Sequence, residues 1–159
     1  MNMLRERTVP STRPVPDEAM FDEPRARRSP AALRMLGAVA VLVVGAVHLE
    51  QYYGVHFSVV PVIGPLFVLN FAGAIVIGLG LLVPSARMRL VHVLLALGGI
   101  GLAATSFVFL VVSERRPLFG FQDYGYRPAI IIALIAEGLA VLLLSAYLGV
   151  RARASRRTT

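Results

Sequence analysis

The chain has 159 residues, a formal net charge of +7 and 57% apolar residues, which is more apolar material than one soluble core of this size buries. Its mean hydropathy of +0.72 places that excess in lipid, and all 16 basic residues are arginines that gather in the tails and short loops. This distribution is typical of a membrane protein and argues against nucleic-acid binding, which needs basic and aromatic side chains on a folded polar face. The lack of cysteine excludes disulfides, thiolate metal sites and iron–sulfur clusters.

The N-terminal segment, residues 1–32, is predicted to be a disordered cytoplasmic tail. Its prolines stand among mixed charges, and it has too few apolar side chains to offset the entropy lost on ordering. The composition becomes apolar abruptly at Leu33. A secretory signal peptide is the rival interpretation of the first apolar run. However, a long tail precedes that run, no small-x-small cleavage site follows it, and three more runs come after it.

Four apolar runs have the length of a bilayer-crossing helix, which is about 20 residues. Pro61, Pro84 and Pro128 mark the boundaries of the later runs, and a basic cytoplasmic tail, residues 151–159, completes the chain. The sequence therefore predicts an all-α fold, a four-helix transmembrane bundle. The predicted spans are residues 33–53, 62–83, 90–112 and 129–150.

The arginines also predict the orientation of the bundle. Those before the first span, in the turn 85–89 and after the fourth span all fall on one side of a four-span protein. The positive-inside rule makes that side cytoplasmic. The other side receives an arginine-free loop after the first span and the loop 113–127, in which acidic residues partly balance the arginines. We therefore expect a multi-pass protein of the cell membrane with both termini in the cytoplasm.

Aromatic side chains gather in the two predicted outer segments, which hold seven of the thirteen in the chain. One explanation is an aromatic belt at the outer membrane interface. The other is a pair of interfacial or partly re-entrant loops that cap the bundle and shape a mouth. The seven residues are Tyr52, Tyr53, Phe57, Phe119, Phe121, Tyr124 and Tyr126.

Each predicted span brings a polar side chain into the outer half of the membrane. At 1.5 Å per residue, Glu137 lies roughly 15 Å, Asn70 about 13 Å and His48 roughly 6 to 9 Å below the outer interface. Gln51 and Tyr52 follow His48 at i+3 and i+4 and therefore share its helix face. Polar groups at such depths are costly and normally face the bundle interior. The candidate ligand or proton site is His48, Gln51, Tyr52, Asn70, Thr105, Ser106 and Glu137.

Two interpretations of these side chains stay open. In the structural one, His48, Asn70, Thr105 and Glu137 hydrogen-bond across helices and hold the bundle together. A buried, neutral Glu137 is then an acceptable partner for His48 or Asn70. In the functional one, the same groups bind a ligand, a substrate or a proton.

No cofactor, metal site or catalytic residue is indicated. His92 lies roughly 15 to 20 Å from the depth of His48, so these two histidines cannot ligate one haem iron. His56 and Glu50 offer too few ligands, without a spacing motif, to indicate a metal site. No P-loop, GxSxG elbow, dinucleotide fingerprint or HExxH helix is present. An enzymatic activity is therefore unsupported.

Residues 46–53 (AVHLEQYY), 61–67 (PVIGPLF) and 117–121 (PLFGF), together with Ala136-Glu137, resemble a family of small, uncharacterised four-span membrane proteins of actinobacterial type. The resemblance covers roughly residues 33–148. It implies a shared fold and an emphasis on the His and Glu positions, and it carries no activity.

Two further families are less similar. Size and span count are distantly similar to DoxX-like proteins, without a diagnostic motif. The small multidrug transporters also use one intramembrane glutamate, but theirs lies in the first span. That departure disfavours drug/proton exchange.

The sequence favours a structural or accessory component of a membrane complex. Its expected partners are the lipid bilayer and either another membrane protein or a second copy of the chain, and no nucleic acid. The alternative is a binding or transport protein for a small molecule, a lipid or a proton-coupled substrate. That alternative uses an outward-facing polar pocket around His48 and Glu137.

Overall fold

The computed structural model describes residues 30–120, 122, 125 and 127–156. The tail predicted over residues 1–32 therefore lies outside the described residues, except for its last three, which begin the first helix. The four long helices are α1 (Pro30–Gly54), α2 (Ile63–Leu82), α3 (Arg89–Arg115) and α4 (Pro128–Ser155). Two short 3₁₀ turns, η1 (Phe57–Val59) and η2 (Ala86–Met88), lie between α1 and α2 and before α3.

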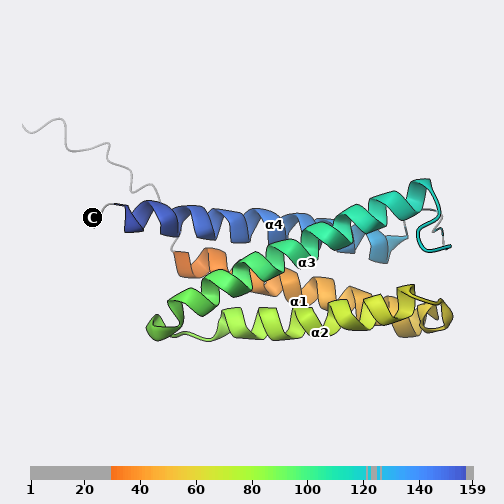
Figure 1. Ribbon diagram of the computed structural model, residues 1–159, viewed down its shortest axis with the longest axis horizontal. Helices are drawn as coiled ribbons and strands as arrows, with labels where there is room; N and C mark the ends of the chain where they lie inside the picture. The colour runs from red at the N-terminus through yellow and green to blue at the C-terminus, as the bar shows by residue number, and fades with distance from the viewer. Residues whose placement is uncertain (1–29, 121, 123–124, 126, 157–159) are drawn as a thin grey trace, which may run out of the picture.

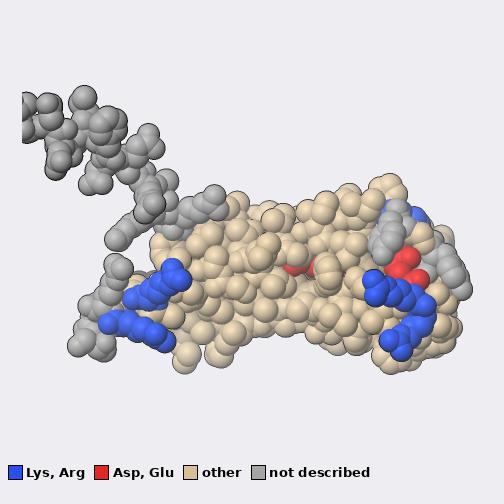
Figure 2. All heavy atoms as spheres, turned by 90° about the horizontal axis from the view of Figure 1, so that it is seen from above, with Lys and Arg blue, Asp and Glu red and all other residues tan. Residues whose placement is uncertain are grey.

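All four helices are long and apolar enough to cross a membrane. They pack side by side as an elongated bundle (Figure 1), which confirms the predicted four-helix transmembrane fold. Large apolar side chains remain exposed along the sides of the bundle, among them Leu69, Leu90 and Leu142. Arginines gather at the two ends, with an apolar band between them (Figure 2). This is the architecture of a multi-pass membrane protein, in which lipid covers the apolar band.

The helix α1 forms most of the interior contacts, because it packs along both α2 and α4, while α3 packs on α4 and α2. Small side chains dominate the centre of the core: Ala38, Ala74, Ala96, Ala103 and Ala140 are fully buried. Small residues allow helix backbones to approach closely, and this approach is the main source of packing energy between helices in lipid. These small residues pack in one core with the fully buried side chains of Val41, Leu81 and Leu144.

The contact between α1 and α2 is the clearest case. A Cβ atom added at Gly45 would lie 2.6 Å from the Cβ atom of Ala74, and one added at Gly78 would lie 2.5 Å from the side chain of Leu42. Real Cβ atoms do not approach other atoms so closely. The Cβ atom of Ala74 moves only with its helix, so Gly45 requires glycine if α1 and α2 are to keep their separation, whereas at Gly78 the side chain of Leu42 would have to move.

The two ends of the bundle differ. The terminal end carries the start of α1, the connection between α2 and α3, and the end of α4; the loop end carries the other two connections. At the terminal end α4 continues five residues past the predicted span, through Ser155. Nothing in that stretch breaks a helix, since Arg and Ala are good helix formers. Arg151 also donates a hydrogen bond to the Tyr147 hydroxyl one turn earlier, at 2.8 Å.

At the loop end, η1 folds back onto the bundle. Phe57 is buried and packs edge-to-face on Phe67, with ring centroids 5.3 Å apart, and the guanidinium of Arg127 lies 5.7 Å from the Phe57 ring. Tyr53, by contrast, is exposed, as expected for an interfacial belt. The aromatic residues of this end therefore divide between a cap and the bundle surface. Phe121, Tyr124 and Tyr126 lie outside the described residues.

A candidate ligand-binding cavity

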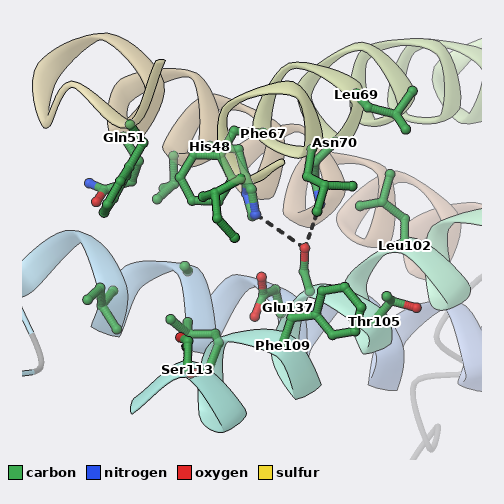
Figure 3. A pocket seen from close by; sticks show the side chains of 18 of the residues that line it. His48, Gln51, Phe67, Leu69, Asn70, Leu102, Thr105, Phe109, Ser113 and Glu137 are labelled. Atoms are coloured by element: carbon green, nitrogen blue, oxygen red, sulfur yellow. Dashed lines mark hydrogen bonds between the residues drawn. The ribbon is translucent and has the colours of Figure 1, made fainter. Parts of the chain in front are cut away.

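A cavity of about 370 Å³ lies inside the bundle, in the half nearer the loop end, and all four helices contribute to its wall (Figure 3). Small-molecule sites in proteins are usually apolar pockets of about 300 to 1,000 Å³ with a few placed polar groups. This wall has that composition, because rings and aliphatic side chains such as Phe67, Leu102 and Phe109 surround a small set of polar side chains.

The cavity reaches the surface of the bundle between α2 and α3. Leu69 of α2 and Thr105 and Phe109 of α3 line it and are also exposed at the sides of the helices. Phe57 and Leu118, from the two connections at the loop end, complete the wall. These three side chains therefore belong both to the cavity wall and to the outer surface of the bundle.

A chain of hydrogen bonds crosses three helices at the cavity wall. The side-chain amide of Asn70 in α2 donates to the Ser106 hydroxyl in α3 at 2.5 Å, and Ser106 Oγ lies 3.2 Å from His48 Nε2 in α1. His48 Nδ1 lies 2.9 Å from the carbonyl oxygen of Val44. Figure 3 shows the first two of these bonds as dashed lines.

The direction of these bonds follows from the groups involved. A carbonyl oxygen can only accept, so His48 Nδ1 carries a hydrogen and donates a hydrogen bond to the carbonyl oxygen of Val44. In a neutral ring His48 Nε2 is then an acceptor, and the Ser106 hydroxyl donates to it. Ser106 also accepts a hydrogen bond from Asn70. Its hydroxyl group is thus both a donor and an acceptor, and it links the side chains of His48 and Asn70 on two other helices.

Glu137 of α4 is the least exposed of the polar side chains in the wall, at 1%. Its carboxyl group points into the cavity, from the side opposite His48 and Asn70 in Figure 3. Neither carboxyl oxygen has a hydrogen-bond partner. A buried polar group without a partner costs free energy, and an ionised one costs far more, so a donor that reached this carboxyl group would stabilise it.

Two more acceptors in the wall lack partners, Gln51 Oε1 and Asn70 Oδ1. The amide nitrogen of Gln51 donates to the carboxylate of Glu50 and does not supply a donor to the cavity. The cavity thus contains four buried oxygen atoms without a donor: one each from Gln51 and Asn70, and two from Glu137. Its chemistry is complementary to a molecule that donates hydrogen bonds.

Six of the seven candidate residues line this one cavity: His48, Gln51, Asn70, Thr105, Ser106 and Glu137. Tyr52 is the exception, because its ring packs edge-to-face on Tyr53 with a centroid separation of 4.9 Å. Thr105 lies at the exposed rim. Neighbouring helix residues point about 100° apart, so Ser106 faces the other helices and Thr105 does not. His48 and Asn70 therefore share hydrogen bonds with Ser106 on another helix, whereas Glu137 has no partner among the described residues.

One polar lining residue is absent from the sequence-based set. Ser113 is buried in the cavity wall and donates to the Leu110 carbonyl at 2.8 Å. It follows Ser106 at i+7, which places both on one face of α3. That spacing is a signal in the sequence from which Ser113 could have been found.

The remaining histidines lie elsewhere. His92 is at the terminal end, where its Nε2 lies 3.3 Å from Arg34 Nη1 and 3.0 Å from the carbonyl oxygen of Val83, whereas His48 lies near the loop end. His56 is an exposed residue of the connection between α1 and α2. Within residues 30–120, 122, 125 and 127–156, no group of three or more metal-binding side chains is present.

The chain matches no protein-family model, and neither curated proteins nor solved structures give a significant match. The resemblance to small four-span membrane proteins therefore stays a prediction.

Proposed function

We propose that this membrane protein binds a small amphipathic molecule that enters its cavity from the lipid. The single observation that supports this function is Glu137, a fully buried carboxyl group that faces a cavity and has no hydrogen-bond partner. A purely structural glutamate would be expected to contact a donor on another helix. The carboxyl group of Glu137 has no such donor, and a ligand that carries a hydrogen-bond donor would supply it.

The wall also defines the class of ligand. Most of it is apolar, so the body of the ligand is apolar, and the unpartnered acceptors at Gln51, Asn70 and Glu137 require a head group with several donors. A protonated amine satisfies both the hydrogen bonds and the charge of an ionised Glu137. We therefore assign the site to a membrane-soluble amine. An alternative function for the same site is transport of the ligand or of a proton across the membrane.

Thermal unfolding in nanodiscs of phosphatidylcholine tests this proposal. We expect octylamine to raise the unfolding temperature in a saturable manner, whereas octanol, which has the same chain and no positive charge, has little effect. A ligand at 100 times its Kd stabilises the folded state by about 2.7 kcal/mol. The Glu137→Gln variant should lose this response, because it keeps the shape of the side chain and cannot become negative.

Glu114→Gln is the matched control. Glu114 is a carboxyl group near the loop end that accepts a hydrogen bond from the Gly125 amide and does not line the cavity. This variant should respond to octylamine as the natural chain does. An equal response in the Glu137→Gln variant, or an equal response to octanol, would refute the proposal.

The second candidate function is a structural or accessory component of a membrane complex. The hydrogen bonds from Asn70 through Ser106 to His48 favour it, because they link α1, α2 and α3 without the help of a ligand. In that case Glu137→Gln should leave both stability and assembly unchanged. A stoichiometric partner retained in mild detergent, together with no response to any amine, would support this function.

We also propose that both termini lie in the cytoplasm. Among the described residues, the terminal end carries six arginines and no acidic residue, while the loop end carries three arginines with Glu50 and Glu114. The positive-inside rule then assigns the terminal end to the cytoplasmic face. The six arginines are Arg34, Arg87, Arg89, Arg151, Arg153 and Arg156.

A further inference from the structure

A second pocket, of about 600 Å³, opens at the terminal end of the bundle. It lies between the start of α1, the connection from α2 to α3, and the last turns of α4. This pocket is separate from the cavity at the loop end, and no residue lines both. Its polar lining residues are Arg34, Ser85, Arg89, His92, Tyr147, Arg151 and Ser155.

The lining is strongly unbalanced in charge. Arg34, Arg89 and Arg151 contribute three positive charges, and no acidic residue lines the pocket. The acidic side chains within residues 30–120, 122, 125 and 127–156 are Glu50, Glu114 and Glu137, and all of them lie elsewhere. Like charges gathered without a counter-charge repel one another, so a bound anion would stabilise this end of the bundle.

Arg34 is the decisive residue, because it is a buried cation with an exposed fraction of only 8%. Its Nη1 atom donates to the carbonyl oxygens of Leu81 and Val83 at the end of α2, and lies 3.3 Å from His92 Nε2. These neutral partners accept hydrogen bonds from Arg34, and the two carbonyl oxygens lie at the negative end of the α2 dipole. They supply no full negative charge, and a buried charge is normally paired with one.

Arg89 and Arg151 each have N–H groups that make no hydrogen bond within the described part of the chain. Arg151 uses Nη1 for the Tyr147 hydroxyl and the Arg89 carbonyl. The guanidinium of Arg89 makes no hydrogen bond or ion pair within the described part of the chain. An arginine guanidinium has five N–H donors in a planar fork that matches the oxygen atoms of phosphate. The Tyr147 hydroxyl accepts from Arg151 and can still donate its own hydrogen.

We infer that this pocket binds a phosphate group, and that the group is the head of an anionic membrane lipid. Arg89 and Arg151 lie at the ends of helices that cross the membrane, which is the level of lipid head groups. Leu90, the residue after Arg89, is 70% exposed to the lipid-facing side, so acyl chains can continue from the pocket along the bundle. Basic pockets between transmembrane helices are the kind of site that holds anionic head groups.

The test uses the full-length chain in nanodiscs and native mass spectrometry. We expect the protein extracted from mixed membranes to retain phosphatidylglycerol in preference to phosphatidylcholine. We also expect nanodiscs that contain phosphatidylglycerol to raise its unfolding temperature. Arg89→Gln and Arg151→Gln should each weaken lipid retention by about fivefold, because each variant loses a hydrogen bond from the guanidinium to the phosphate, and one such bond contributes about that factor. Arg34 is left unchanged in this test, because its bonds to α2 make it part of the fold.

Arg87→Gln is the matched control, since Arg87 lies two residues from Arg89 at the same end and does not line the pocket. It should retain phosphatidylglycerol as the natural chain does. A parallel arm adds inorganic phosphate to phosphatidylcholine nanodiscs. Stabilisation there equal to that by phosphatidylglycerol, and lost in Arg89→Gln, would keep the phosphate site and assign it to a soluble phosphate compound. No preference for phosphatidylglycerol and no effect of phosphate would overturn the proposal, as would an equal loss of retention in Arg87→Gln.

Discussion

Ser106 connects the polar side chains of three helices, and this role can be tested at the level of one residue. Its hydroxyl accepts from Asn70 and donates to His48. Replacing it with alanine removes both bonds and leaves the half-buried polar groups of His48 and Asn70 without this partner. The adjacent Thr105 has a hydroxyl group at the exposed rim and offers a natural comparison.

We expect Ser106→Ala to lower the free energy of unfolding by about 1 to 2 kcal/mol, since hydrogen bonds between membrane helices contribute about 0.6 to 2 kcal/mol. Thr105→Val should change it by less than about 0.5 kcal/mol, which is usual for surface substitutions. Unfolding by sodium dodecyl sulfate in mixed micelles, followed by circular dichroism, measures both. Equal losses in the two variants would show that the bonds at Ser106 contribute nothing specific.

Glu137 leads to the opposite expectation, because its carboxyl group is buried without a partner. Glu137→Met keeps the length of the side chain, fills the same space and removes an unsatisfied polar group. We expect it to raise the free energy of unfolding by about 1 kcal/mol and to abolish stabilisation by octylamine. Loss of stability in the same unfolding assay would mean that the carboxyl has a partner in the folded protein.

At the scale of the elements, the bundle depends on the close approach of α1 to α2. The two helices meet through glycine and alanine, and the added Cβ at Gly45 would collide with Ala74. Gly101 of α3 is equally helical, but a Cβ there would have no atom within 4 Å. Comparing alanine substitutions at Gly45 and Gly101 therefore distinguishes the effect of glycine on helix packing from its effect on helix propensity.

Gly45→Ala should therefore destabilise the protein by about 1 to 3 kcal/mol, the usual cost of overpacking a core. Gly101→Ala should be neutral or stabilising by up to about 1 kcal/mol, because alanine is the better helix former. The ratio of folded to unfolded protein across a detergent titration measures the difference. If Gly45→Ala were as well tolerated as Gly101→Ala, the two helices would lie further apart than described.

For the molecule as a whole, the asymmetry of charge between its ends predicts its direction in the membrane. Single cysteines can be placed freely, since the chain has none. Ser58, in η1 at the loop end, and Ser155, at the end of α4, are both exposed. They report on opposite ends of the bundle.

In intact cells, Ser58→Cys should react with a membrane-impermeant maleimide and Ser155→Cys should not, because the arginine-rich end faces the cytoplasm. Labelling of Ser155→Cys after the cells are permeabilised is the control for its reactivity. The reverse pattern in intact cells would place the terminal end outside.

The number, type and approximate bounds of the helices could be predicted from the sequence, because lipid imposes one requirement on every span. About 20 apolar residues are needed to cross the bilayer, and each helix satisfies its own backbone hydrogen bonds without help from its neighbours. The four apolar runs therefore specify α1 to α4 independently of packing. The helix period also indicated that His48 and Gln51 share a face, and both line the cavity.

Partner choice across helices was decided by the tertiary structure alone. The period of a helix gives the face of a residue but not the helix that it meets. Whether Ser106 or Thr105 would contact His48 depended on the rotation of α3, which the packing of small core residues sets. The same packing leaves Glu137 without a donor, removes Tyr52 from the site and brings Arg34 to the end of α2. These are long-range contacts between helices, and no local pattern in the chain encodes them.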